Sequence, residues 1–311
     1  MPIRIASAHA FDTSLGNLMR RQIALGESQE QLTSGKRVLK PSDDPTAAAR
    51  AERALAQINR TEANQRALDA SRSTMQQTEV ALGDASELVQ QVRELMVSAG
   101  NASYSDAERK TVAVSLRGLR TQLLSVANRS DGAGGYLFGG QGSTAEPFVD
   151  ALGGVNFQGT TGSLRAATDD PLPLSVDGQA AWLGARDVLT GVADISLFDV
   201  IDAAVASLET PNLSSGAIVD AVHTALRDLD AASNNLSGWR ARSGEALSRA
   251  DSMEERFGQV KLGAQKERSE AEDLDMVKSI ADFQAKQTGY QAALQTYSMV
   301  QKLSMFDYIG R

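Results

Sequence analysis

The sequence predicts a mainly α-helical fold: a long rod, built as an antiparallel helical bundle or coiled coil from both chain halves, with a small β-rich outer domain inserted between them. None of the 7 prolines lies between Pro45 and Pro147 or after Pro211, so two long stretches are free to be helical. By contrast, 13 of the 26 glycines lie between Gly132 and Gly191, where turns and short strands such as LPLSV are expected.

This pattern predicts an N-terminal segment at 1–45, a helical rod at 46–131 and 196–270, an outer domain at 132–195 and a C-terminal helix at 271–311. An unbroken helix over 46–99 would be about 80 Å long. Heptad spacing predicts buried faces in the rod. These faces comprise Met75, Thr78, Leu82, Ala85, Val89, Val92 and Met96, and then Val112, Leu116, Leu119, Leu123 and Val126. Ser105 and Glu108 have the spacing of a capping box at the start of the second helix.

Both chain ends continue the heptad pattern, but with glutamines among the apolar residues. The N-terminal stripe comprises Phe11, Leu15, Leu18, Gln22, Leu25, Gln29 and Leu32. The C-terminal stripe comprises Met276, Ile280, Phe283, Gln287, Tyr290, Leu294, Tyr297 and Gln301. Glutamine at such positions weakens an isolated coil while favouring a defined partner and register. We therefore expect both ends to be loose in the monomer and to become ordered against other chains.

Residues 32–52, LTSGKRVLKPSDDPTAAARAE, predict a sharp break between two helices. Gly35 fits the C′ position that ends the first helix, and Pro41 forces the preceding residue toward an extended conformation. Asp44 then fits the N-cap of the next helix, with Pro45 at its first position. Lys36 and Arg37 are interpreted as cations near the negative end of the helix dipole. A catalytic role for the adjacent carboxylates Asp43 and Asp44 is the weaker alternative.

Composition argues against several classes of protein. The chain has 31 basic and 39 acidic residues and a net charge of −8, which disfavours nucleic-acid and anionic-membrane partners. It has no cysteine, and His9 and His223 are its only histidines, so we expect no metal site, no cofactor and no catalytic residues. Residues 1–19 lack the pattern of a secretory signal, which taken alone predicts a cytoplasmic protein. A cytoplasmic coiled-coil adaptor and an extracellular enzyme using 132–195 remain as alternatives.

Four segments resemble the flagellin superfamily. Residues 32–52 resemble its N-terminal signature, 127–148 its turn into the outer domain, 237–251 its returning helix and 273–309 its C-terminal assembly helix. Within the family, the DDPTAA motif, the ending KLSMFDYIGR and the short insertion resemble the hook–filament junction members more than filament flagellin, which stays the alternative.

The resemblance implies a secreted structural subunit rather than an enzyme. Such proteins leave the cell unfolded through the flagellar type III export apparatus, which replaces the cytoplasmic prediction by an extracellular location at the hook–filament junction. The implied partners are further copies in a ring, a neighbouring hook-associated junction protein, flagellin on the filament side and a cytoplasmic export chaperone. The chaperone would bind the C-terminal stripe around Phe283, Tyr290, Leu294 and Tyr297, which could equally pack against the N-terminal helix of the same chain.

Overall fold

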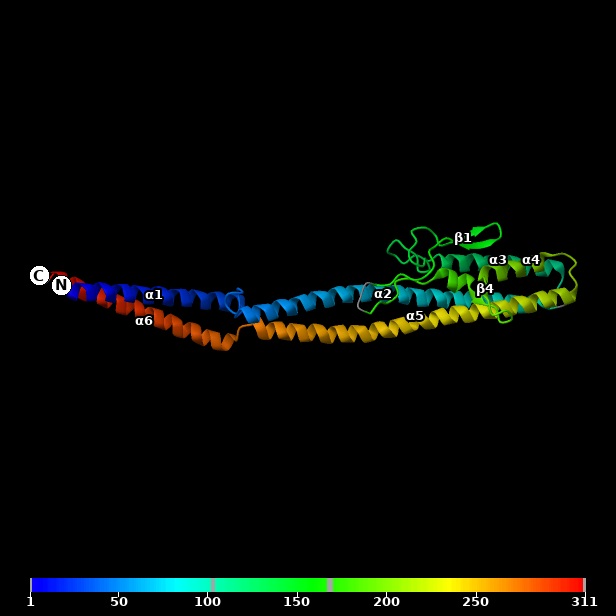
Figure 1. Cartoon of the computed structure of the whole chain (residues 1–311). Helices are drawn as coiled ribbons and strands as arrows, with labels where there is room; N and C mark the ends of the chain where they lie inside the picture. The colour runs from blue at the N-terminus through cyan, green and yellow to red at the C-terminus, as the bar shows by residue number, and fades with distance from the viewer. Residues whose placement is uncertain (1, 102–103, 167–169, 310–311) are drawn as a thin grey trace. The chain divides into compact units, whose positions relative to one another are not determined.

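The computed structural model describes residues 2–101, 104–166 and 170–309, with side chains from residue 12 to residue 299 of these ranges. Long helices dominate the chain, which confirms the predicted fold class (Figure 1). The helices are α1 (Pro2–Ser34), α2 (Pro45–Ala99), α3 (Asp106–Ala127), α4 (Leu197–Glu209), α5 (Ser215–Glu272) and α6 (Met276–Ile309).

The chain forms two compact units. The first contains the residues up to Thr61 and those from Gln259 onward, and the second is Glu62–Gly258. Helices α2 and α5 contribute to both units, so the division falls inside these helices and not at the ends of the predicted insertion. The reason is that the insertion shares its hydrophobic core with the helices around it.

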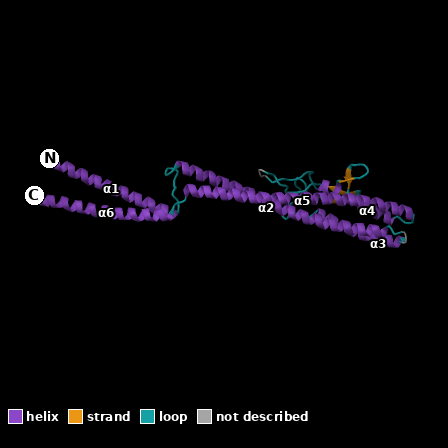
Figure 2. Cartoon of the chain, turned by 90° about the horizontal axis from the view of Figure 1, so that it is seen from below, coloured by secondary structure: helices purple, strands orange, loops and turns teal. Residues whose placement is uncertain are grey.

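The core of the second unit follows the predicted heptad faces. All seven predicted residues on α2, from Met75 to Met96, are buried. On α3, Val112 is half-buried and Leu116, Leu119, Leu123 and Val126 are buried. The opposing face of α5 has the same alternation of three and four residues, formed by Ile218, Val222, Ala225, Leu229, Ala232 and Leu236. Figure 2 shows α3 and α4 alongside the long helices α2 and α5.

Local signals set the helix starts in this unit. Ser105 and Glu108 form the predicted capping box, in which each side chain accepts from the backbone N–H of the other residue. Ser196 caps α4 by accepting a hydrogen bond from the backbone N–H of Asp199 at 3.2 Å. The apolar residues of α4 lie on the face that is buried against the core.

The insertion contains two short antiparallel hairpins. The first pairs β1 (Phe148–Ala151) with β2 (Gly154–Phe157), and the second pairs β3 (Ala185–Arg186) with β4 (Ala193–Ile195). The turn of the first hairpin is Leu152–Gly153, and the Leu152 side chain is fully exposed. Residues 172–176, expected to form a strand, make only isolated backbone bonds, such as that from Leu174 N to Leu164 O at 2.7 Å. Regular strand is therefore sparser than the glycine-rich composition suggested.

An aromatic cluster joins the insertion to the helices. Phe138, Phe148 and Trp182 come from the insertion, and Phe198 comes from α4. The Trp182 ring stacks on the Phe198 ring with centroids 6.0 Å apart, and it meets the Phe138 ring edge-on at 5.3 Å. All four side chains are buried, so the insertion and the helices have one continuous core.

Candidate assembly surface

The end of α1 depends on Gly35. Its backbone N–H donates to the Gln31 carbonyl at 2.9 Å, and its φ of +70° lies in the left-handed region that favours glycine. A turn follows in which Asp43 N donates to Lys40 O at 2.9 Å, with Pro41 in the second position that proline favours. Gly35 and Pro41 thus hold the positions expected from the sequence.

Two adjacent aspartates precede α2, and one of them caps it. The Asp44 carboxylate accepts from Ala47 N at 3.0 Å, and Pro45 is the first residue of the helix. The Ala47 N–H, then the Thr46 hydroxyl and the Arg37 guanidinium, lower the pKa of Asp44 to about 2. Asp43 instead accepts from the N–H groups of Lys40 and Leu39, which lower its pKa. Both carboxylates therefore have hydrogen-bonding roles in the break.

A second break, between α5 and α6, lies against the first. Asp275 caps α6 by accepting from Lys278 N at 3.1 Å. The end of α5 and the residues after it pair with the segment after α1: Arg37 N donates to Glu272 O at 2.7 Å, and Leu274 N donates to Gly35 O at 3.0 Å. We call this pairing of 35–38 with 271–274 the break contact.

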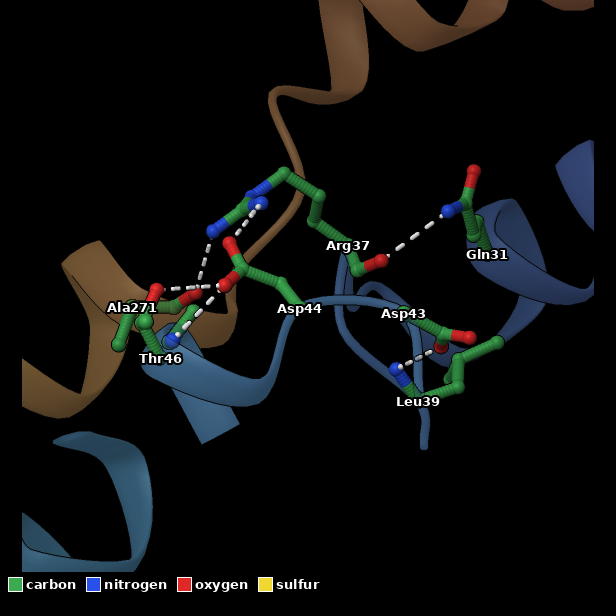
Figure 3. A network of polar contacts seen from close by, with 8 residues as sticks. Gln31, Arg37, Leu39, Asp43, Asp44, Thr46 and Ala271 are labelled. Carbon is green, nitrogen blue, oxygen red and sulfur yellow. Dashed lines mark hydrogen bonds and ion pairs between the residues drawn. The ribbon is translucent and has the colours of Figure 1, made fainter. Parts of the chain in front are cut away.

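Side chains reinforce the break contact (Figure 3). The Arg37 guanidinium donates to the Ala271 carbonyl at 2.8 Å and to the Asp44 carboxylate at 3.2 Å. Lys36 pairs with Glu272 at 3.2 Å, and Val38 is buried beneath. Lys36 and Arg37 therefore bind a segment distant in sequence, a role additional to the one predicted for them as cations just after the end of α1. Periodicity gives no signal for this pairing, because the two segments are separated by most of the chain.

Helices α1 and α6 contact one another within the first unit. In the N-terminal stripe, Leu15, Leu18, Leu25 and Leu32 are half-buried, whereas Gln22 and Gln29 are exposed. The Phe11 side chain lies outside the described residues. Ser28, which the stripe omitted, is buried and accepts a hydrogen bond from the Lys286 ammonium at 2.5 Å.

The C-terminal stripe divides in the same way. Phe283, Tyr290 and Tyr297 are half-buried, whereas Met276, Ile280, Gln287 and Leu294 are exposed. The Gln301 side chain lies outside the described residues. The half-buried members recur every seven residues, and half-buried Ser279 and Ala293 lie four residues before Phe283 and Tyr297. The predicted stripe therefore contains two sets of residues. The half-buried set lies at the contact between α1 and α6, and the exposed set faces away from it.

The pair of helices leaves much apolar surface uncovered. Met19, Ile23, Val277 and Met299 are more than half exposed, and Ile280 and Leu294 are 46% and 41% exposed. Over residues 12–34 and 276–299, Ser28 is the one buried side chain, so this described part contains no buried apolar residue. A helix pair with no closed core is a candidate surface for partner helices.

Other kinds of site are not found in the described part of the chain. No group of three or more histidine, cysteine, aspartate or glutamate side chains is arranged to hold a metal ion there. None of the described helices combines the length and the apolar character that crossing a membrane requires.

Comparisons with known proteins agree with the resemblance noted in the sequence. Residues 10–143 match the bacterial flagellin N-terminal helical region. Flagellar hook-associated protein 3 of Salmonella typhimurium is 29% identical over 98% of this chain and 99% of its own. Flagellin of Bacillus subtilis is 23% identical over 90% of each chain.

The fold also matches solved structures of this kind. The crystal structure of the flagellar junction protein FlgL from Legionella pneumophila aligns with a TM-score of 0.59 at 18% identity, covering 72% of this chain and all of that one. The chain therefore carries a match to the bacterial flagellin N-terminal helical region and is similar over nearly its whole length to flagellar hook-associated protein 3.

Proposed function

We propose that this chain is a structural subunit that joins the hook to the filament of the bacterial flagellum, and that it has no enzymatic role. The observation that carries the proposal is the incomplete packing of α1 against α6 in the described part of the chain. Each large apolar side chain contributes about 1.5–3 kcal/mol when it becomes fully buried. The exposed residues of α1 and α6 would therefore stabilise contacts with neighbouring subunits.

In this proposal, the half-buried members of the N-terminal and C-terminal stripes have a different role from the exposed members. Leu18, Leu25, Phe283, Tyr290 and Tyr297 hold α1 and α6 together in the subunit. The exposed members Gln22, Gln29, Ile280, Gln287 and Leu294 contact other copies in a ring, the neighbouring hook-associated protein and the filament side. The ends would be loose before assembly and ordered afterwards, because helices with little burial are marginal in water.

Export and chaperoning complete the proposal. The subunit would be secreted unfolded by the flagellar type III apparatus and would act outside the cell. Before export, a cytoplasmic chaperone would cover the C-terminal stripe, since that surface is otherwise exposed apolar area.

Filament flagellin is the alternative, favoured by the match of residues 10–143 to the flagellin N-terminal region. Higher identity over a larger share of the chain supports the junction subunit: 29% over 98% for the hook-associated protein, against 23% over 90% for flagellin.

A deletion strain of the source bacterium tests the proposal. We expect it to make hooks, to lack filaments and to release flagellin into the medium, with filaments restored by the gene on a plasmid. Immunogold labelling of the restored cells should mark a single band between hook and filament. Labelling along the filament would favour flagellin instead, and normal filaments on the deletion strain would refute both assignments.

A further inference from the structure

A cavity of about 390 Å³ is lined by residues of the second unit alone. One wall is a face of α5 that includes Trp239, Arg242 and Ala246. The opposite wall is formed by parts of the insertion, including Arg165 and Pro173. The volume falls within the range of cavities that hold small organic molecules, which is about 300–1,000 Å³.

The insertion wall is fixed in place by several contacts. Asp170 pairs with Arg249 at 2.7 Å and with Arg256 at 3.8 Å. The Ser71 hydroxyl donates to the Pro173 carbonyl at 2.6 Å, which ties the wall to α2. Pro171 and Pro173 restrict the backbone between these contacts. The cavity is therefore formed before any ligand arrives, which limits the entropic cost of binding.

Two arginines lining this cavity have no carboxylate partner among the described residues. Arg249 pairs with Asp170, whereas neither Arg165 nor Arg242 forms an ion pair with any residue that the structure describes. The Arg242 guanidinium lies over the Trp239 ring, 4.5 Å from its centroid, in a cation–π contact. Among the described lining residues, Glu245 is the one further carboxylate, and like Arg165 and Arg242 it is exposed. The described lining residues thus comprise three arginines and two carboxylates, in a chain whose net charge is −8.

The floor of the cavity is apolar. Met75, Val176 and Ala246 are buried there, next to the hydroxyl groups of Ser163 and Ser175. A lining that combines two guanidinium groups with an apolar floor suits a ligand with a charged end and a compact body.

We propose that this cavity binds a small organic acid, with its carboxylate held by Arg165 and Arg242 and its body against the apolar floor. The same carboxylate chemistry could be supplied by an aspartate or glutamate side chain of a second copy of this chain. The experiment below separates these two sources.

Titration calorimetry on the full chain tests the proposal with two matched pairs of probes: 4-hydroxybenzoate with its amide, and glucuronate with glucuronamide. We expect at least one acid to bind and its uncharged amide to bind about tenfold more weakly or worse, because the amide loses the ionic pairing. Arg165→Gln and Arg242→Gln should each weaken binding of the acid by a similar factor. Arg240→Gln is the matched control, since Arg240 pairs with Glu79 at 2.6 Å and does not line the cavity. Thermal melts confirm that the variants are folded.

A second arm measures self-association by sedimentation at low and high salt. If no acid binds, but Arg165→Gln and Arg242→Gln abolish a salt-sensitive self-association that Arg240→Gln leaves intact, the carboxylate comes from a neighbouring copy. Equal binding of an acid and its amide would overturn the proposal. So would the absence of both acid binding and arginine-dependent self-association. Neither arm depends on hooks or filaments, so failure here leaves the proposed junction role untouched.

Discussion

The guanidinium of Arg37 donates a hydrogen bond to the carbonyl of Ala271, a residue 234 positions further along the chain, at 2.8 Å. The same side chain also reaches Asp44, the cap of α2. One arginine therefore links the C-terminal end of α5 to the N-terminal end of α2.

Replacing Arg37 with alanine should loosen the break contact without unfolding the second unit. One hydrogen bond contributes about 0.5–1.5 kcal/mol, so local opening should rise by about two- to tenfold. Hydrogen exchange at the amides of Arg37 and Leu274, both bonded across the break, measures this effect. Arg53→Ala is the control, because among the described residues Arg53 bonds within its own helix, to the Ala49 carbonyl at 3.2 Å. Unchanged exchange at position 274 would contradict the role given to Arg37.

The cap of α2 should weaken in acid. The pKa of Asp44 is lowered from its usual 3.8 to about 2, so its charged form is favoured in the folded chain. Its contribution to stability is therefore complete above about pH 4 and is lost as the pH falls towards 2. NMR titration of the Ala47 amide should report this transition. Asp44→Asn keeps a capping oxygen but does not titrate, so it should flatten the response; a midpoint near 4 in the parent chain would refute the cap.

Truncation of Trp182 should destabilise the whole second unit and not the insertion alone. Trp182→Ala removes a fully buried ring from the shared core and should cost about 3–5 kcal/mol. Chemical denaturation followed by helical circular dichroism measures the loss. Leu152→Ala, at a fully exposed turn, should change stability by less than about 0.5 kcal/mol. A helical transition unaffected by Trp182→Ala would show that the insertion folds independently.

Arg120 should contribute more to folding stability than its exposed neighbour Arg117. Arg120 is buried on α3 and pairs with Asp150 of β1 at 2.7 Å and Asp202 of α4 at 2.7 Å. Both carboxylates are partly exposed, so Arg120→Met should cost about 1–3 kcal/mol, below the value for a fully buried pair. Arg117→Met removes an exposed pair with Glu209 and should cost about 0–1 kcal/mol. Equal losses in denaturant melts would refute this ranking.

A charge on the exposed side of α6 should block assembly without unfolding the subunit. Ile280 and Leu294 face away from the α1 contact, so Ile280→Asp and Leu294→Asp should leave the melting temperature nearly unchanged. Filament formation in the deletion strain should fail with either variant, because a charge would be buried at the subunit contact. Val188→Asp, at an exposed position in the insertion, is the matched control. Normal filaments with Ile280→Asp would refute the proposed surface.

Much of the second unit was predictable because its signals are local and periodic. The face from Met75 to Met96 is buried throughout, and Ser105 with Glu108 forms the capping box that their spacing predicts. Gly35, Asp44 and Pro45 were predictable for a similar reason, since each acts on backbone groups within four residues.

The rest depends on contacts that a pattern along the chain does not encode. The pairing of Arg37 with Ala271 joins segments from opposite halves of the sequence. In the terminal stripes, a seven-residue repeat predicts the half-buried positions Leu18 and Leu25. It does not decide whether the next contact lies three or four residues further on, and the structure buries Ser28 while Gln29 is exposed. The sharing of one core by Trp182 and Phe198 was equally hidden, because glycine-rich composition predicts turns but not what packs beneath them.

The turn between β1 and β2 has a practical consequence. Leu152 is fully exposed, and a Cβ atom added at Gly153 would have no other atom within 4 Å. A short peptide epitope inserted between these residues would lengthen a loop at little cost in free energy, since closure entropy grows slowly with length. Such a tag would let antibodies detect the assembled flagellum on intact cells without changing the helices of the subunit.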